Sequence, residues 1–124
     1  IEVDKRMKDS GIRAFGVHPG GIMTPLQRHL EQEEMVALGW MDEDGQPTER
    51  VAKMFKTPTQ GASTSLWAAT SPQLNDIGGV YCENCEVAAP TDDGENARFI
   101  GVNDWAVDSE EASRLWDETE RMLS

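Results

Sequence analysis

The stretch HPGGIMTPLQ, residues 18–27, limits the folds open to this chain more than any other part of the sequence. It follows the apolar run IRAFGV, residues 12–17, whose length and composition predict a buried strand. Pro19 fixes its own φ, and the two glycines after it carry no Cβ. The backbone can therefore turn sharply at the end of this strand and approach another group closely.

A helix is predicted to begin directly after this turn. Thr24 can accept a hydrogen bond from an amide of the first turn, Pro25 sits where no amide is needed, and Gln27 can complete a capping box. The helix is expected to run to Leu38, with Gly39 as its C-cap. Amides at a helix start could face a bound ligand.

The elements on either side of the turn favour an α/β fold with a parallel sheet. IEVDKRMKDSG predicts a helix that ends at Gly11, and no N-cap residue precedes it, so we expect the chain to open inside a helix, as a fragment would. Thr57, Pro58 and Gln60 predict a second capped helix, whose small residues suit either ordinary packing or a subunit interface.

The second half of the chain is predicted to contain one strand and an amphipathic C-terminal helix. VYCENCEVA, residues 80–88, has the pattern of a strand of mixed polarity. Asp108 and Glu111 predict the start of the last helix. Three polar segments between these elements are predicted loops: residues 41–50, 71–79 and 91–99.

Charge and composition exclude several classes of partner. The formal charge is −12, from 23 acidic and 11 basic residues, which opposes binding to nucleic acid and to anionic membranes. No apolar run approaches ~18 residues and no signal peptide is evident, so a soluble, cytoplasmic protein is expected. A length of 124 residues with two cysteines suits one domain or part of one, without a disulfide framework.

The order of five sequence blocks resembles the C-terminal part of a short-chain dehydrogenase/reductase. The blocks are HPGGIxTP, KTPxQGA, WAATSP and the later GGVY and DWAVD segments, and they are most similar to the retinol-dehydrogenase-like and WW-domain-oxidoreductase-like branch. The resemblance spans nearly the whole chain. It implies the C-terminal part of a Rossmann-like doubly wound parallel sheet, with residues 1–124 as a single partial domain.

The resemblance also implies a cofactor, NAD or NADP, and positions for its contacts. Pro19, Gly20 and Gly21 would shape the turn, the Ile22 backbone would bond the nicotinamide carboxamide, and Thr24 would touch the carboxamide or the pyrophosphate. Residues 22–56 would cover the substrate, with Leu26, Leu30 and Met35 as lining residues.

The family's catalytic groups are not found in this sequence. Such enzymes use a Tyr-x-x-x-Lys pair, in which the lysine lowers the tyrosine pKa. Here Tyr81 is the only tyrosine and Cys85 stands four residues later; the glycine-rich phosphate-binding turn is missing as well. No catalytic residue is therefore assigned, and the segment alone is expected to be inactive.

Other chemistry-bearing residues have simpler interpretations. Cys82 and Cys85 could form a redox pair or half of a zinc site, but on an extended strand they would point to opposite faces, which favours ordinary thiols. His18 suits either a pocket residue or a packed, hydrogen-bonded one, and His29 a surface residue. DEDG, residues 42–45, predicts a solvated acidic turn rather than a calcium loop. No metal site is predicted.

Two functions from different classes are compatible with these residues. The first is the cofactor- and substrate-closing segment of an NAD(P)-dependent oxidoreductase that transfers hydride between nicotinamide and a small-molecule alcohol or carbonyl substrate. The alternative is a non-catalytic dimerisation or scaffold module derived from that fold. Without the other strands of the sheet, apolar faces would be left uncovered, so a homo-oligomer is expected.

Overall fold

The computed structural model describes residues 1–91 and 100–124, which form an α/β structure. The predicted loop at 91–99 lies almost entirely outside the described residues. The chain divides into two compact units, one made of Ile1–His18 and Thr64–Ser124 and the other of Pro19–Ser63. Among the described residues no helix has the length and apolar character needed to cross a bilayer.

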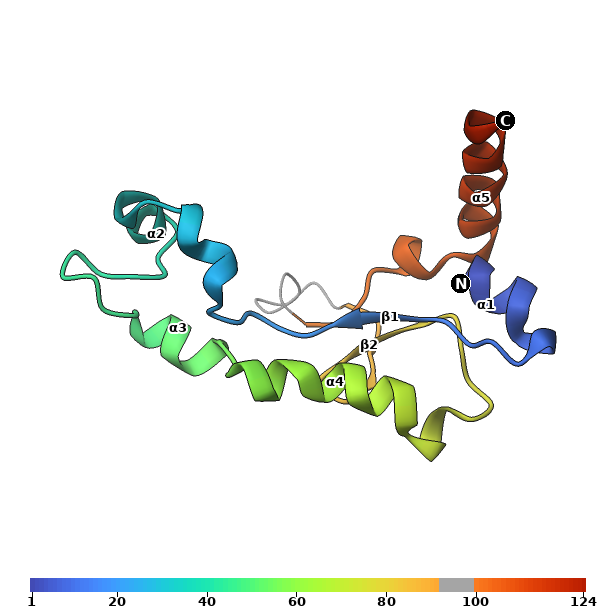
Figure 1. The fold of residues 1–124 in the computed structure, drawn as a ribbon, viewed down its shortest axis with the longest axis horizontal. Coiled ribbons are helices and arrows are strands. Elements are labelled where there is room, and N and C mark those ends of the chain that lie inside the picture. Colours follow the sequence, from blue (N-terminus) through green and yellow to red (C-terminus); the bar gives the residue numbers. More distant parts are fainter. Residues whose placement is uncertain (92–99) are drawn as a thin grey trace. The chain divides into compact units, whose positions relative to one another are not determined.

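The sheet of the first unit contains the predicted parallel pair. Strands β1 (Phe15–His18) and β2 (Val80–Glu83) lie side by side and pair in parallel, and β3 (Glu86–Val87) pairs with β2 in the antiparallel direction (Figure 1). The described sheet has the order β1-β2-β3. It confirms the α/β class, whereas the doubly wound parallel sheet is not seen in this three-stranded mixed sheet.

The prediction of one strand over residues 80–88 was wrong, because the chain reverses in its middle. Asn84 and Cys85 have φ values of 50° and 61° and form a two-residue hairpin turn between β2 and β3. The Cys85 amide donates to the Thr64 hydroxyl at 3.3 Å, which helps to hold this left-handed conformation. Cys82 and Cys85 therefore do not lie on one extended strand.

The first helix, α1 (Glu2–Met7), continues as a 3₁₀ turn that ends at Gly11, whose φ is 77°. This confirms the predicted helix and its glycine C-cap. Both carboxylates on its buried side are paired. Arg13 donates two hydrogen bonds to Asp4, and Arg6 donates to Glu2 at 2.7 Å.

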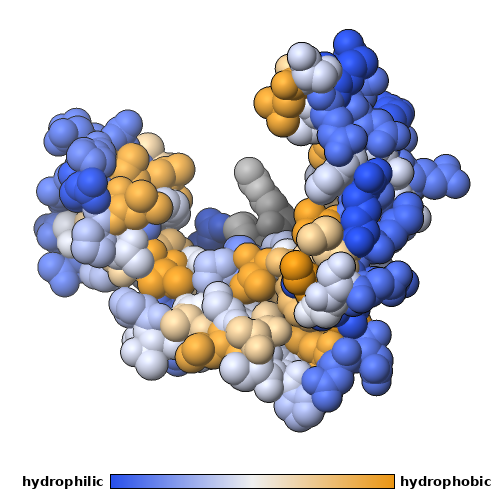
Figure 2. All heavy atoms as spheres, turned by 45° about the vertical axis from the view of Figure 1, so that its right-hand side comes forward, coloured by the Kyte–Doolittle hydropathy of each residue, from blue (hydrophilic) through white to orange (hydrophobic). Residues whose placement is uncertain are grey.

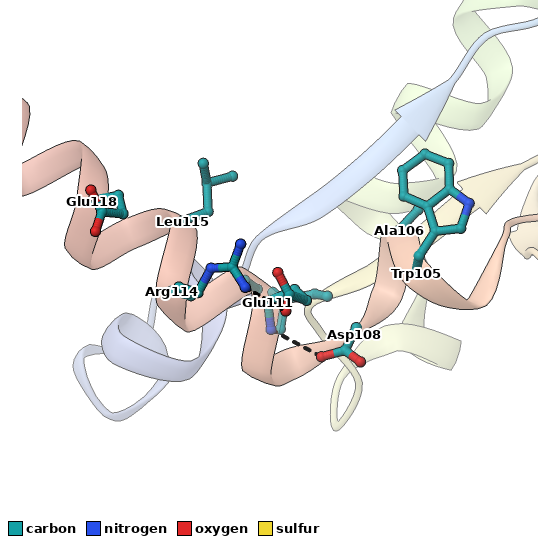
Figure 3. Close-up of a pocket in the computed structure, with 9 residues that line it drawn as sticks. Trp105, Ala106, Asp108, Glu111, Arg114, Leu115 and Glu118 are labelled. Atoms are coloured by element: carbon teal, nitrogen blue, oxygen red, sulfur yellow. Dashed lines mark hydrogen bonds and ion pairs between the residues drawn. The ribbon is translucent and has the colours of Figure 1, made fainter.

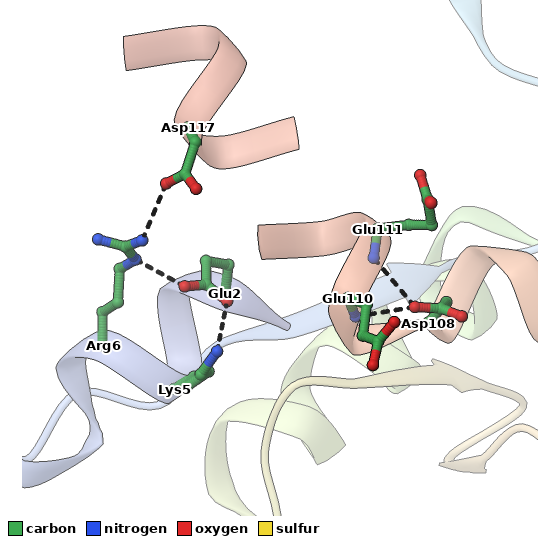
Figure 4. Close-up of polar contacts among 7 residues, drawn as sticks. All are labelled: Glu2, Lys5, Arg6, Asp108, Glu110, Glu111 and Asp117. Carbon is green, nitrogen blue, oxygen red and sulfur yellow. Dashed lines mark hydrogen bonds and ion pairs between the residues drawn. The ribbon is translucent and has the colours of Figure 1, made fainter. Parts of the chain in front are cut away.

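The C-terminal helix, α5 (Ser109–Leu123), begins as predicted, because Asp108 Oδ1 accepts from the Glu110 and Glu111 amides. It contacts α1. The Arg6 guanidinium lies 4.8 Å from the ring centre of Trp116 and 3.6 Å from Asp117, so Arg6 links the two helices (Figure 4). Leu115, Met122 and Leu123 of α5 are exposed. Figure 2 shows a cluster of apolar side chains near the free end of this helix, beside a surface that is mainly hydrophilic.

In the second unit, the predicted helix from Pro25 to Leu38 is broken into two short ones. A 3₁₀ helix covers Pro25–His29, and α2 covers Gln32–Ala37. Leu30 between them is extended, with ψ of 129°, and Glu31 starts a second capping box. No residue of either helix is buried, so no packing favours a continuous helix over this new start.

The segment predicted as a loop at 41–50 contains a turn and then a helix that sequence reasoning missed. Asp42 Oδ1 accepts from two amides of the DEDG turn region, which confirms an exposed turn there. Helix α3 (Glu49–Met54) begins after Thr48, whose hydroxyl accepts from the Val51 amide. Val51 is buried, and its side chain gives α3 an anchor.

Helix α4 (Pro58–Thr70) confirms the second capped helix. Thr57 and Gln60 exchange the two hydrogen bonds of a capping box, at 2.9 and 3.2 Å. Gly61, Thr64 and Ala68 are its buried positions and recur at helical spacing. The predicted loop after α4 includes a 3₁₀ turn over Pro72–Leu74, in which Leu74 is buried.

Candidate functional site

The Pro-Gly-Gly turn follows directly on the carboxyl end of β1, which is a strand of the parallel pair. In open α/β sheets, ligands bind beyond the carboxyl ends of parallel strands. Gly20 has φ of 93°, a conformation that favours glycine. The predicted turn at the end of a strand is therefore confirmed.

The two glycines of the turn are closely approached by Phe55 and Lys56. A Cβ on Gly20 would lie 2.9 Å from Lys56 Cδ and 3.1 Å from Lys56 Nζ. A Cβ on Gly21 would lie 3.0 Å from two ring carbons of Phe55. The sequence predicted that the backbone of the turn lies very close to another group. The side chains of Phe55 and Lys56 make this close approach, and sequence reasoning did not identify them.

Backbone hydrogen bonds fix this arrangement. The Lys56 amide donates to the Gly21 carbonyl at 2.8 Å, and Ile22 and Lys56 form a parallel β-bridge. The Ile22 side chain lies against Gly61 of α4, where a Cβ would collide with Ile22 Cδ1. The sequence segments HPGG and FKTPTQG are therefore in contact in the structure. Their glycines are the sequence signal that could have indicated this contact.

The predicted Thr24–Gln27 capping box is present beside the turn. Gln27 Oε1 accepts from the Thr24 amide at 2.7 Å, and Thr24 Oγ1 accepts from the Leu26 amide at 3.2 Å. Gln27 Nε2 also donates to the Ile22 carbonyl at 3.0 Å. The helix after this cap is a 3₁₀ helix of five residues, too short to build up the partial positive charge found at the N-terminus of a longer α-helix.

The three predicted substrate residues come from separate parts of the second unit. Leu26 is 78% exposed, whereas Leu30 and Met35 are half-buried on either side of the break between the two short helices. A hollow of about 530 Å³ beside α2 has other lining residues: Gln32, Glu33, Val36, Ala37 and Glu43. The role of the three residues in substrate binding stays a prediction.

In the first unit, the carboxyl ends of β1 and β2 bring three polar side chains together. His18 Nδ1 lies 3.9 Å from Glu83 Oε2, and the His18 ring stacks on Tyr81 with 6.4 Å between ring centres. Glu83 is buried, and its Oε1 accepts from the Gly101 amide at 2.6 Å. The His18 side chain is 45% exposed, and 3.9 Å is longer than a hydrogen bond, so the packed, hydrogen-bonded interpretation of His18 is not confirmed.

Neither Tyr81 nor Cys82 has the features of an activated catalytic group. Burial, with a contribution from the Glu83 charge, raises the pKa of Tyr81, so its phenol keeps its proton at neutral pH. Burial also raises the pKa of the Cys82 thiol, which disfavours the reactive thiolate. Within the described part of the chain, no group of three or more His, Cys, Asp or Glu side chains could hold a metal ion.

A wider hollow of about 720 Å³ lies along α5 in the first unit (Figure 3). Its polar groups are engaged with one another or with the helix: Asp108 caps α5, and Arg114 donates to Glu111 at 3.0 Å. Trp105 and Leu115 give it an apolar side. None of the predicted site residues lines it.

Comparison with known proteins gives relatives along almost the whole chain. The chain is 42% identical over 113 residues to a probable oxidoreductase of Streptomyces lividans, which covers 91% of this chain and 37% of that protein. It is 34% identical over 123 residues to the short-chain dehydrogenase/reductase prx1 of Penicillium roqueforti, covering 99% and 34% of the two chains. Retinol dehydrogenase 11 of Homo sapiens is 30% identical over 116 residues, covering 94% and 29%.

The chain therefore spans about a third of the length of the curated relatives that it matches. These coverages are consistent with the sequence-based interpretation of a segment of a longer dehydrogenase/reductase. No protein-family model matches the chain, and no solved structure matches it.

Proposed function

The chain belongs to the short-chain dehydrogenase/reductase family, and we propose from this membership that the full-length protein is an NAD(P)-dependent oxidoreductase. The observation that carries the proposal is the similarity to named oxidoreductases over 91–99% of the chain. When bound, NAD(P) supplies or accepts the hydride that is exchanged with an alcohol or carbonyl carbon. Residues 1–124 contribute binding and positioning rather than the proton-transfer groups.

The groups beside the turn suit the carboxamide of a nicotinamide ring, which both donates and accepts hydrogen bonds. The Ile22 carbonyl is engaged by Gln27, so the Ile22 amide is the backbone group assigned to the ligand. The Thr24 hydroxyl accepts from the Leu26 amide and donates to Gln27 Oε1 at 3.1 Å, which fixes its orientation beside the turn. Neutral donors and acceptors of this kind fit an uncharged carboxamide.

The turn is held in place by contacts that do not need a ligand. The bridge between Ile22 and Lys56 fixes its backbone, and the collision that a Cβ on Gly61 would cause shows how closely Ile22 is packed. A preorganised turn loses little conformational entropy on binding. Pro19, Gly20 and Gly21 contribute by shaping the backbone in this proposal.

Residues 22–56 cover the substrate in the proposed enzyme. Leu26, Leu30 and Met35 would present an apolar wall, which suits an alcohol or carbonyl compound whose body is apolar. The 78% exposure of Leu26 supports this role because such a side chain gains by covering a ligand.

The test is a titration of the full-length protein with NADH and with NADPH, followed by cofactor fluorescence. Binding of one of them is expected, and Thr24→Val should weaken it while Thr24→Ser restores it. Thr57→Val is the matched control, because Thr57 caps α4 with the same capping box. If neither dinucleotide binds, the oxidoreductase proposal is wrong.

A second candidate, a non-catalytic dimerisation module, is supported by the apolar residues of α5. Leu115, Met122 and Leu123 are 67%, 70% and 82% exposed. Light scattering after size-exclusion chromatography measures association directly. Association without dinucleotide binding would favour this candidate, and dinucleotide binding would favour the enzyme.

A further inference from the structure

Lys56 is placed beside the Pro-Gly-Gly turn by both its backbone and its side chain. Its amide donates to the Gly21 carbonyl at 2.8 Å, so its Cα is fixed relative to the turn. Its alkyl chain then lies across Gly20, within 2.9–3.1 Å of the position that a Cβ would occupy there. The ammonium group is therefore held within contact distance of the turn.

Lys56 lies in a unit that is acidic overall. Residues 19–63 contain seven acidic residues and four Lys or Arg. Lys56 is half-buried against Gly20, next to the Phe55 ring on Gly21.

An ammonium group at this place has a clear chemical use. A dinucleotide carries two negative charges on its pyrophosphate, and an acidic unit repels them unless a cation lies close by. A lysine binds phosphate as a point charge with three donors. The turn residues Ile22 and Thr24 are neutral and cannot supply this charge.

We propose that Lys56 binds the pyrophosphate of the nicotinamide dinucleotide, and that Gly20 is a glycine so that the Lys56 side chain can reach across the turn. This inference rests on the proposed function, because it assumes a dinucleotide at the turn. It adds a cofactor-binding residue from the segment that precedes α4, which the sequence-based assignment did not include.

The experiment compares dinucleotide affinity among variants of the full-length protein by isothermal titration calorimetry. Lys56→Met keeps the alkyl chain over Gly20 and removes the charge, and Lys56→Arg keeps the charge. Lys53→Met is the matched control, because Lys53 lies three residues earlier, at the exposed surface of α3. ADP-ribose, which has the pyrophosphate and lacks nicotinamide, is a second probe.

We expect Lys56→Met to weaken the affinity for NADH or NADPH and for ADP-ribose by about ten-fold or more, the range for a hydrogen bond to a charged group. Lys56→Arg should stay within about three-fold of the wild type and Lys53→Met should be unchanged. The affinity of the wild type should also fall more steeply with added salt than that of Lys56→Met.

The outcomes separate the two proposals. If the wild type binds a dinucleotide and Lys56→Met binds both probes equally well, the Lys56 inference is wrong and the proposed function stands. If Lys56→Met weakens NADH but not ADP-ribose, Lys56 does not bind the pyrophosphate, and the inference is again overturned. If the wild type binds neither probe, the proposed function itself fails.

Discussion

Two segments of the chain begin with nearly the same four residues and fold differently. TPLQ at 24–27 and TPTQ at 57–60 each form a capping box, in which the threonine amide donates to the glutamine Oε1 at 2.7 and 2.9 Å respectively. The first is followed by a 3₁₀ helix of five residues, whereas the second starts an α-helix of 13 residues. The cap is the same, so the difference must come from the residues beyond it.

Burial accounts for the difference. Gly61, Thr64 and Ala68 of α4 are buried, whereas no residue of the two short helices between Pro25 and Ala37 is. Short helices are marginal in water, and packing supplies most of their stability. A capping box therefore determines where a helix begins, and burial determines how far it continues.

The largest effect is expected from adding bulk at the most closely packed point of α4. In Gly61→Val the new side chain would overlap Ile22 Cδ1, and overpacking of this kind costs about 1–3 kcal/mol of unfolding free energy. Denaturant unfolding of the full-length protein measures this cost. Ala62→Val is the control, because the same valine at an exposed position of the helix costs only about 0.5 kcal/mol.

The Gly61→Val prediction also has an internal rescue. Shortening the partner side chain with Ile22→Ala should recover part of the lost stability in the double variant. Equal stability of Gly61→Val and Ala62→Val would contradict the view that packing on Gly61 sustains α4.

The second-largest effect is expected from removing the cap hydroxyl at either of the two capping boxes. Thr57→Val and Thr24→Val each remove one cap hydroxyl at a cost of about 1 kcal/mol. Thr57→Val should lower helical content, measured by circular dichroism, more than Thr24→Val, because α4 is the longer helix. Thr24→Val should be the one that weakens dinucleotide binding, and equal effects on binding would remove the functional distinction between the two segments.

The same comparison explains how much of the molecule the sequence could predict. The caps at Thr24, Thr57 and Asp108 and the glycine stop at Gly11 were predicted, because each depends on a few adjacent residues. Family membership was also predicted from the sequence blocks. Each of these features depends on residues that lie close together in the sequence.

The features that were missed depend on contacts between distant residues. Helix α3 is anchored by the buried Val51, which polarity alone did not reveal in a segment full of turn-forming residues. The hairpin at Asn84 and Cys85 has no glycine to announce it and is supported by Thr64, about twenty residues away. The contact of Lys56 with Gly20 likewise joins residues more than thirty positions apart.

A smaller effect is expected at Leu30, where the helix predicted from Pro25 to Leu38 is broken into two short ones. The Glu31 amide donates to Glu34 Oε2 at 2.9 Å, which fixes a new helix start directly after Leu30. Glu34→Ala removes the carboxylate that accepts this hydrogen bond, and the cost should be about 0.5 kcal/mol or less because the site is exposed. Backbone chemical shifts should then show Leu30 moving toward helical values. Unchanged shifts would mean that the box does not cause the break.

The smallest expected effect is on the pH dependence of stability, at helix α1. Asp4 of this helix accepts hydrogen bonds from Arg13 and from the Ala14 amide, which both lie outside α1. Hydrogen bonds from Arg13 and from the Ala14 amide hold the pKa of Asp4 below its usual value of 3.8. A lowered carboxyl pKa stabilises the fold above the unfolded-state pKa, and this contribution is lost as the pH falls through the folded-state pKa. The unfolding free energy of the wild type should therefore decline below about pH 4.

Asp4→Asn cannot titrate, so its stability should fall less steeply over that range in denaturant unfolding series. Equal slopes for the two proteins would show that the stability of the fold does not depend on the charge of Asp4.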